Sequence, residues 1–93
     1  MKKSDIIKVL KPQGFVKAKG IVVSREAWKQ VTNYDRNTLS YYIAKADNYS
    51  LVIEQIHNKE NYDADYLNKI EKVLLDADFV VNNDGGYLLV KQK

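Results

Sequence analysis

The polar side chains between residues 36 and 45 are the ones with the clearest binding chemistry. Apolar residues recur there at Leu39, Ile43 and Ala46, which is the i, i+4, i+7 spacing of one helix face. A helix over residues 36–46 then turns its remaining polar side chains outward, namely Arg36, Asn37, Ser40 and Tyr41. Asparagine can bond an adenine edge through two hydrogen bonds, arginine can do so with guanine, and serine and tyrosine hydroxyls reach phosphates. The spacing therefore predicts a helix whose outer face contacts nucleic acid.

The residues before this helix predict a partner helix and a turn. Ser24 opens residues 24–31, and Glu26 places an acid in the first turn, as at many helix starts. Ala27 and Val31 would face the second helix, so the pair has the form of a helix-turn-helix. Thr38 lies near the start of the second helix, where free N–H groups favour a phosphate oxygen.

Charge is unevenly distributed along the 93 residues. Residues 1–45 hold ten Lys and Arg against three Asp and Glu, whereas residues 46–93 hold five Lys against nine acids. A positive lobe attracts polyanions, although blocks of charge also serve simply to solvate a surface. We expect the basic half to bind DNA phosphates, and the interface to include Lys17, Lys19, Arg25, Lys29, Arg36 and Lys45.

The tyrosines of the basic half leave the form of the nucleic acid open. Tyr34, Tyr41 and Tyr42 are interleaved with the basic residues. Aromatic rings on a positive surface suit single strands, because any base can stack on them. A helix-turn-helix suits the major groove of a duplex instead. Duplex and single-stranded DNA are both retained as candidate partners.

The rest of the chain predicts further helices and strands around this unit. Residues 4–11 form a helix that starts at Ser4 and stops before Pro12 and Gly14. Residues 15–23 read either as one strand bent at Gly20 or as a hairpin.

The second half contributes a strand, a helix and a hairpin. Residues 49–58 are strand-like, and a helix runs from Asp63 or Asp65 to about Ala77. Asp84-Gly85 lies between two apolar runs, the signal of a C-terminal β-hairpin. No linker divides the chain. We therefore predict one α+β domain over residues 1–93, a small winged-helix-like domain with a helix-turn-helix and a C-terminal β-hairpin.

These residues carry a family resemblance. "SREAWKQV" followed by "YDRNTLSYYI" resembles the helix-turn-helix of excisionase-like winged-helix proteins, over residues 22–75. In that likeness "YSLVIEQIHN" stands where the family has a strand or wing, and "DADYLNKIEKVL" where a closing helix follows. In a second alignment the helix at 64–77 is the last helix and "NNDGG" is the wing. The resemblance implies a regulatory, replication or recombination accessory factor of a phage or other mobile element.

Catalytic and metal chemistry find little support in the residue types. The chain has no cysteine, so disulfides, thiolate metal sites and a cysteine nucleophile are excluded. His57, Asp63 and Asp65 match no zinc or calcium spacing, and no phosphate-binding Gly-Lys-Ser/Thr motif follows Gly14 or Gly20. We predict a non-enzymatic protein with no metal and no cofactor. No apolar run reaches the roughly 20 residues of a membrane span, and the start does not read as a signal peptide, so we expect a cytoplasmic protein.

A protein partner is the alternative to DNA. The second half is acidic, and the edge of the C-terminal hairpin can add a strand to a partner sheet. This pattern suits a small protein-binding module or inhibitor. A homodimer is compatible with either function.

Overall fold

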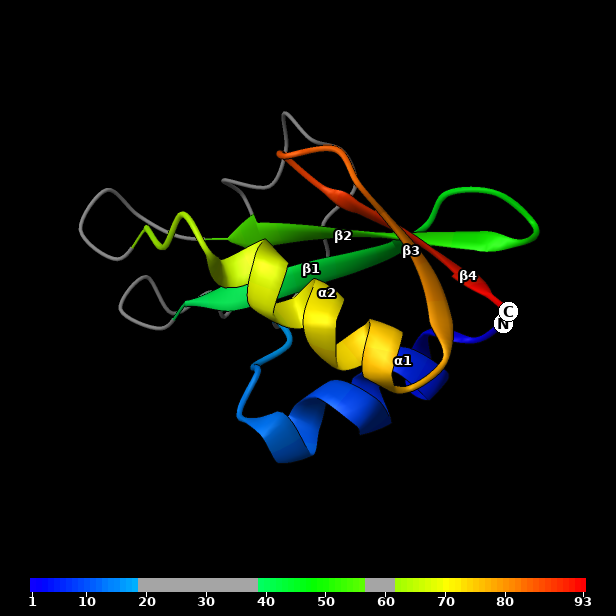
Figure 1. Ribbon diagram of the computed structural model, residues 1–93, viewed down its shortest axis with the longest axis horizontal. Helices are drawn as coiled ribbons and strands as arrows, with labels where there is room; N and C mark the ends of the chain where they lie inside the picture. The colour runs from blue at the N-terminus through cyan, green and yellow to red at the C-terminus, as the bar shows by residue number, and fades with distance from the viewer. Residues whose placement is uncertain (19–38, 57–61) are drawn as a thin grey trace.

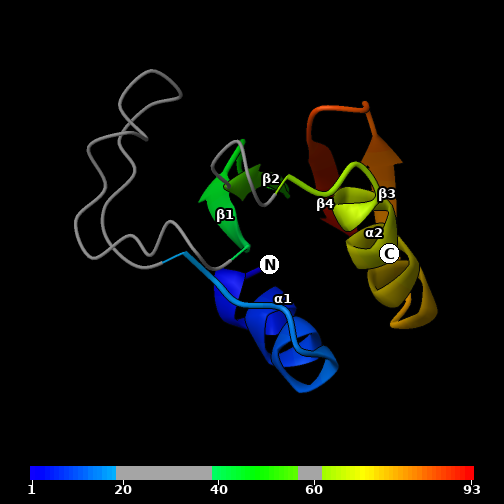
Figure 2. The ribbon, with the colours of Figure 1, turned by 90° about the vertical axis from the view of Figure 1, so that its left-hand side faces the viewer.

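Four strands of the chain form a single antiparallel sheet. The computed structural model describes residues 1–18, 39–56 and 62–93. The strands are β1 (Ser40–Lys45), β2 (Ser50–Ile56), β3 (Phe79–Asn83) and β4 (Leu88–Gln92), in the order β1-β2-β4-β3 across the sheet. Helices α1 (Lys3–Leu10) and α2 (Tyr66–Asp76) cover one face of the sheet (Figure 1, Figure 2). The described part of the chain is therefore a two-layer α+β structure, and the predicted fold class is confirmed at that level.

Helix α2 connects two strands that are not neighbours in the sheet. Strands β2 and β3 both pair antiparallel with β4, so they run parallel to each other with β4 between them. This arrangement is a split β-α-β unit. At the other end of the sheet β1 pairs with β2, with Ile43 opposite Ile53. The last strand in the sequence is thus a central strand of the sheet.

The core lies where the helix-facing side of the sheet meets α1 and α2. Side chains alternate between the two faces of a strand, so Tyr41 and Ile43 share the helix-facing side. On the helices, residues three and four apart share one side. The buried cluster consists of Ile6, Leu10, Tyr41, Ile43, Leu51, Ile53, Tyr66, Leu67, Ile70, Leu74, Leu88 and Val90.

The start of α1 differs from the prediction, whereas its end agrees. Lys2 holds the N-cap position, and its N–H donates to Asp5 Oδ2 at 2.9 Å, so the predicted cap at Ser4 is wrong. An acidic side chain in the first turn stabilises the free N–H groups there. After Leu10 a 3₁₀ turn, η1 (Lys11–Gln13), carries Pro12 and ends at Gly14 with φ 88°. The predicted stop at Pro12 and Gly14 is confirmed.

Helix α2 and the C-terminal hairpin form as the sequence predicts. Asp65 holds the N-cap position of α2, and Asp63 Oδ1 accepts the N–H of Asp65 at 2.9 Å. In the hairpin β3–β4, Gly85 has φ 85°, a conformation that glycine adopts without steric strain. Asn83 Oδ1 accepts the N–H of Gly85 at 2.9 Å, which holds the turn.

The predicted helix over residues 36–46 is wrong at residues 40–45, which form strand β1. Aromatic and β-branched residues favour strands, and Tyr41 and Ile43 alternate with Tyr42 and Ala44 at a period of two. The following turn supports the hairpin, because Asp47 Oδ1 accepts the N–H of Tyr49 at 2.7 Å. A short apolar run fits the spacing of a helix as well as that of a strand, and here pairing with β2 favours the strand.

Much of the predicted helix-turn-helix lies outside the described residues. This holds for the first helix at 24–31, the turn at 32–35 and positions 36–38. The same is true of residues 19–23, the second half of the segment predicted as a bent strand or a hairpin. The strand expected at 49–58 is present as β2. The excisionase-like resemblance itself stays a prediction.

Candidate nucleic-acid interface

Four of the ten predicted interface residues lie in the described ranges. Lys17 and Lys45 are exposed, whereas Ser40 and Tyr41 are buried. The other six lie outside the described residues: Lys19, Arg25, Lys29, Arg36, Asn37 and Thr38. The two polar side chains expected to touch a partner directly are therefore inside the fold, and the two lysines expected to touch phosphates are accessible.

Tyr41 is a core residue, which corrects its predicted role. Its side chain is 0% exposed and packs in the cluster formed by the helices and the sheet. Its hydroxyl has no hydrogen-bond partner among the described residues, and burial raises the pKa of Tyr41. A group sealed in this way cannot reach a phosphate or stack on a base. Ser40 is excluded on the same ground, since it is only 4% exposed opposite Ile56 of β2.

A second buried tyrosine lies close to the first. Tyr66, at the start of α2, is 5% exposed, and its hydroxyl also has no hydrogen-bond partner in the described part of the chain. Burial raises the pKa of Tyr66 strongly, and the nearby Tyr41 and Asp63 raise it further. The ring of Phe15 packs edge-on against Tyr66, with centroids 5.6 Å apart. The two tyrosines are thus structural, and the aromatic side chains near the surface lie elsewhere.

Lys17 is held at the surface by the edge of β1. The N–H of Tyr41 donates to the carbonyl of Val16 at 2.9 Å, and the N–H of Ala18 donates to the carbonyl of Tyr41 at 2.7 Å. These two bonds form an isolated parallel bridge between Lys17 and Tyr41. Because Tyr41 is held in the core, its two backbone bonds fix the chain on both sides of Lys17. The side chain of Lys17 stays exposed.

A groove opens beside this bridge, between α1 and the edge of β1. Its volume is about 460 Å³. We call it the α1–β1 groove, and its lining residues are Ile7, Lys11, Gly14, Phe15, Val16, Lys17, Ala18 and Tyr41. The turn at Gly14 allows the chain to reverse, so that Lys11 before the turn and Lys17 after it line the same groove. The arrangement combines a mostly apolar lining with two cationic side chains.

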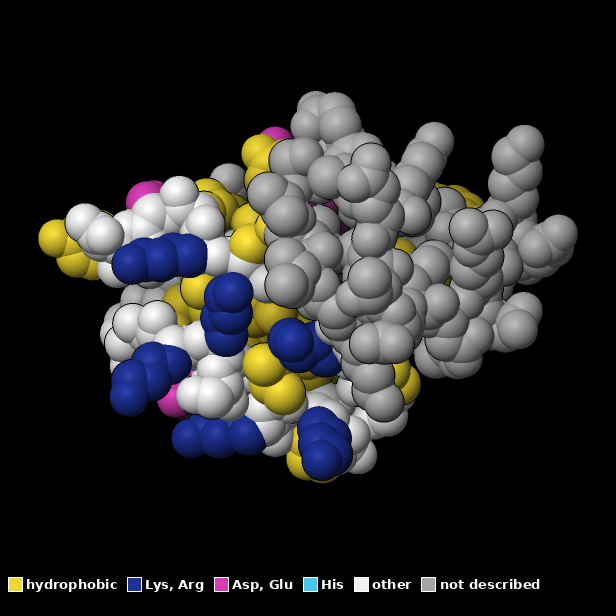
Figure 3. Space-filling view, turned by 180° about the vertical axis from the view of Figure 1, so that it is seen from behind, with side chains coloured by type: hydrophobic (Ala, Val, Ile, Leu, Met, Phe, Trp, Pro, Cys, Tyr) yellow, Lys and Arg dark blue, Asp and Glu magenta, His cyan; other side chains and the backbone are white. Residues whose placement is uncertain are grey.

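Residues 1–18, which supply most of the groove lining, also carry lysines outside the predicted set. Residues 1–18 hold five exposed lysines against the single acid Asp5: Lys2, Lys3, Lys8, Lys11 and Lys17. We call these five the α1 lysine cluster. Lys8 lies 3.8 Å from Asp5. The ion pairs found among the described residues leave the other four unpaired. Figure 3 shows lysine side chains on the left and lower parts of one face of the molecule.

The sequence contained the signal for this cluster. Four of its members, Lys2, Lys3, Lys8 and Lys11, contribute to the charge excess of residues 1–45. They were missed as interface residues because the expected recognition helix drew the prediction toward residues 17–45. Lys8 near the end of α1 and Lys11 at the start of η1 are instead three residues apart, on neighbouring positions of one helical surface.

The acidic side chains gather on and around α2. Residues 62–78 hold five acids against Lys69 and Lys72. Hydrogen bonds from the Asp65 N–H and from Lys69, whose Nζ is 3.1 Å away, lower the pKa of Asp63. The predicted interpretation of Asp63 and Asp65 as helix-start residues is confirmed by their place before α2. Basic side chains thus predominate on and after α1, whereas α2 itself is balanced and the remaining acids of this region lie just before and after it.

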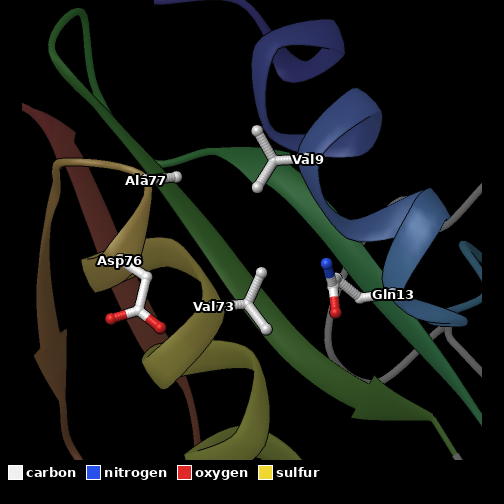
Figure 4. A pocket seen from close by; sticks show the side chains of 5 residues that line it. All are labelled: Val9, Gln13, Val73, Asp76 and Ala77. Carbon is white, nitrogen blue, oxygen red and sulfur yellow. The ribbon is translucent and has the colours of Figure 1, made fainter.

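A smaller groove lies between the two helices and offers no reactive set. Figure 4 shows Val9 and Val73 projecting into it, with Gln13 and Asp76 on opposite sides. Its volume is about 260 Å³. One carboxylate and one amide beside apolar side chains make neither a nucleophile–base pair nor an acid–base pair.

None of the helices in the described ranges has the length and apolar character of a membrane span. Comparison of the chain with protein-family models, with curated proteins and with solved structures finds no match.

Proposed function

We propose that the protein is a non-catalytic nucleic-acid-binding protein that holds a single strand against the α1 lysine cluster and the α1–β1 groove. The observation that carries this proposal is the groove itself, a mostly apolar surface with Lys11 and Lys17 among its lining residues. Single-strand binders combine positive charge that follows the phosphates with apolar and aromatic surface that receives the bases. The groove has both parts in one place.

The charge distribution supports a polyanionic partner. Lys2, Lys3, Lys11 and Lys17 are exposed and form no ion pair with a described acid. Exposed lysines without partners keep their charge available for phosphates. Their neutralisation of phosphates releases counterions, which makes binding strongly dependent on salt.

A single strand is favoured over a duplex by the shape of the described surface. Duplex reading by a helix-turn-helix needs a helix with polar side chains turned to the major groove. Residues 40–45 instead form a strand with Tyr41 in the core. The partly exposed side chains of Phe15 and Val16 at the groove suit contact with unpaired bases.

Charge reversal tests the proposal. Lys11→Glu/Lys17→Glu should weaken binding of a labelled oligothymidylate at least tenfold at about 50 mM salt, because two phosphate contacts become repulsive. The slope of log affinity against log salt should fall by about 1.4, since each neutralised phosphate of a single strand contributes about 0.7. Fluorescence polarisation at two salt concentrations measures both quantities.

Lys72→Glu is the control, because Lys72 is an exposed lysine on helix α2 and does not line the groove. It should leave the affinity and the salt slope nearly unchanged. A duplex of the same length should bind more weakly than the single strand. Absence of binding to any oligonucleotide at low salt, or an equal loss for Lys72→Glu, would refute the proposal.

A further inference from the structure

Strand β3 lies at the edge of the sheet, with a row of backbone groups turned away from β4. The N–H of Asp84 donates to the carbonyl of Tyr87 at 3.0 Å, so that pair is hydrogen-bonded. In an antiparallel ladder hydrogen-bonded pairs alternate with non-bonded ones. The register pairs Asn82 with Leu89 and Val80 with Lys91, so Val80 and Asn82 bond to β4. Phe79, Val81 and Asn83 therefore direct their N–H and C=O groups outward.

This edge lacks the features that usually prevent a strand from pairing with another chain. Edge strands are commonly protected by lysine, proline, a bulge or a covering segment. Strand β3 has the sequence Phe-Val-Val-Asn-Asn, with neither charge nor proline. Within the described ranges it pairs only with β4. Its Val80 side chain is 47% exposed on the face of the sheet opposite the helices.

Helix α2 adds a second exposed apolar side chain beside the same edge. Asn83 Nδ2 donates to Asn68 Oδ1 at 2.8 Å and to Glu71 Oε1 at 3.2 Å. Asn68 and Glu71 thus mark the side of α2 that faces β3. Leu75 falls on that side at i+4 from Glu71 and i+7 from Asn68, and it is 50% exposed. One apolar residue therefore lies on each side of the free edge.

We infer that this edge pairs with β3 of a second copy of the chain, antiparallel across a two-fold axis. The register places Val80 opposite Val80 and Phe79 opposite Val81. Phe79 and Val81 are residues whose backbone groups point outward, so two reciprocal pairs supply the hydrogen bonds. The same register brings Val80 of both copies together on one face and the two Leu75 side chains near the axis on the other. The interface uses β3 and α2, and it is separate from the proposed nucleic-acid site on α1.

A second copy fits this edge because β3 has no charged side chain, so no like charges oppose each other within the paired strands. A two-fold contact also uses one patch twice, so both apolar residues become covered in both copies. The strands of the two sheets then form one continuous sheet, with each α2 beside its symmetry mate.

A single introduced cysteine gives a direct test, since the chain has no cysteine of its own. In the proposed register Val80 opposes itself as a non-hydrogen-bonded pair, for which Cα atoms lie about 4.5 Å apart, within disulfide range. Val80→Cys should form a covalent dimer on mild oxidation at least tenfold faster than Val16→Cys. Val16 is a fair control because it is a valine of similar exposure, 43%, away from β3.

Mass in solution provides the second readout, without nucleic acid present. Sedimentation equilibrium of the unmodified chain should show a dimer that dissociates on dilution. Val80→Lys and Leu75→Lys should each raise the dissociation constant at least tenfold, and Val16→Lys should not, with circular dichroism showing that all three variants are folded. A monomeric mass at every concentration, or equal cross-linking of Val80→Cys and Val16→Cys, would overturn the inference. So would a dimer that Val80→Lys leaves intact.

Discussion

Two tyrosine hydroxyls are buried in the core without a hydrogen-bond partner in residues 1–18, 39–56 and 62–93. The Tyr41 and Tyr66 side chains are 0% and 5% exposed. A buried hydroxyl without a partner lowers the free energy of unfolding by roughly 1–3 kcal/mol. Replacing it with an apolar group removes this cost, so the replacement is close to neutral or stabilising. These tyrosines therefore contribute through their rings, which fill the space between α2 and β1.

Tyr66→Phe should test this at neutral pH. We expect the free energy of unfolding to stay the same or to rise by about 1 kcal/mol, because the ring is kept and only the unpaired hydroxyl is lost. Urea denaturation followed by circular dichroism measures the change. A loss of more than about 1 kcal/mol would indicate that the hydroxyl has a partner after all.

The same substitution should alter the response to alkaline pH. Burial raises the pKa of Tyr41 and Tyr66 above the ordinary value of 10.0. A tyrosine whose pKa is raised by folding stays neutral in the native state while the unfolded chain ionises. Its stabilising effect is complete below pH 10 and is lost as pH rises above that value. Tyr66→Phe should therefore lose less stability than the unmodified chain between pH 9 and 11, and Tyr49→Phe, at a 79% exposed position, should behave like the unmodified chain.

At the scale of elements, the turn of the hairpin β3–β4 depends on one glycine. Gly85 has φ 85°, where any side chain is strained even though a Cβ added there would meet nothing within 4 Å. Gly85→Ala should lower the free energy of unfolding by about 1 kcal/mol. Gly86→Ala is the control, because Gly86 has equal space and no positive φ, and it should stay within about 0.5 kcal/mol of the unmodified chain. Equal effects in urea denaturation would contradict this account.

Local signals were enough to predict most described elements. The apolar stripes of α1 and α2, the run in β2 and the Asp84-Gly85 turn each lie within a short stretch of sequence. Strand β1 was not predicted, because Leu39, Ile43 and Ala46 also have helical spacing. The decisive factor is β2, which pairs with β1 from outside that stretch. Asp47 and Asn48, the turn residues between the two runs, were the available sign of a hairpin.

For the candidate site too, some features follow from the sequence alone and others depend on the fold. The charge excess of the first half is a sum over residues and needs no fold to be seen. Which lysines share a surface depends on the reversal at Gly14, which brings Lys11 and Lys17 to one groove. The fate of Tyr41 depends on strand pairing and on the two helices above it. The basic character of the first half was therefore accessible to sequence reasoning, and the location of the groove was not.

For the whole molecule, the position of β4 makes the end of the chain essential. Strand β4 lies between β2 and β3 and supplies Leu88 and Val90, both 0% exposed. Deletion of residues 88–93 should therefore unfold the protein, because it removes the strand that joins β3 to the rest of the sheet. Deletion of Lys93 alone, which lies beyond β4, should leave the fold intact. Circular dichroism and thermal melting distinguish the outcomes, and a folded product lacking β4 would contradict the central role of this strand.

The backbone bridge at Lys17 has a consequence for assembly. Tyr41 uses both its N–H and its carbonyl on residues 16–18 of the same chain, so the β1 border is blocked at that position by the protein itself. In the dimer inferred above each copy pairs through β3, and the bridge leaves no free backbone group at Tyr41 for a further strand. The bridge therefore opposes extension of the sheet beyond two molecules at this part of β1.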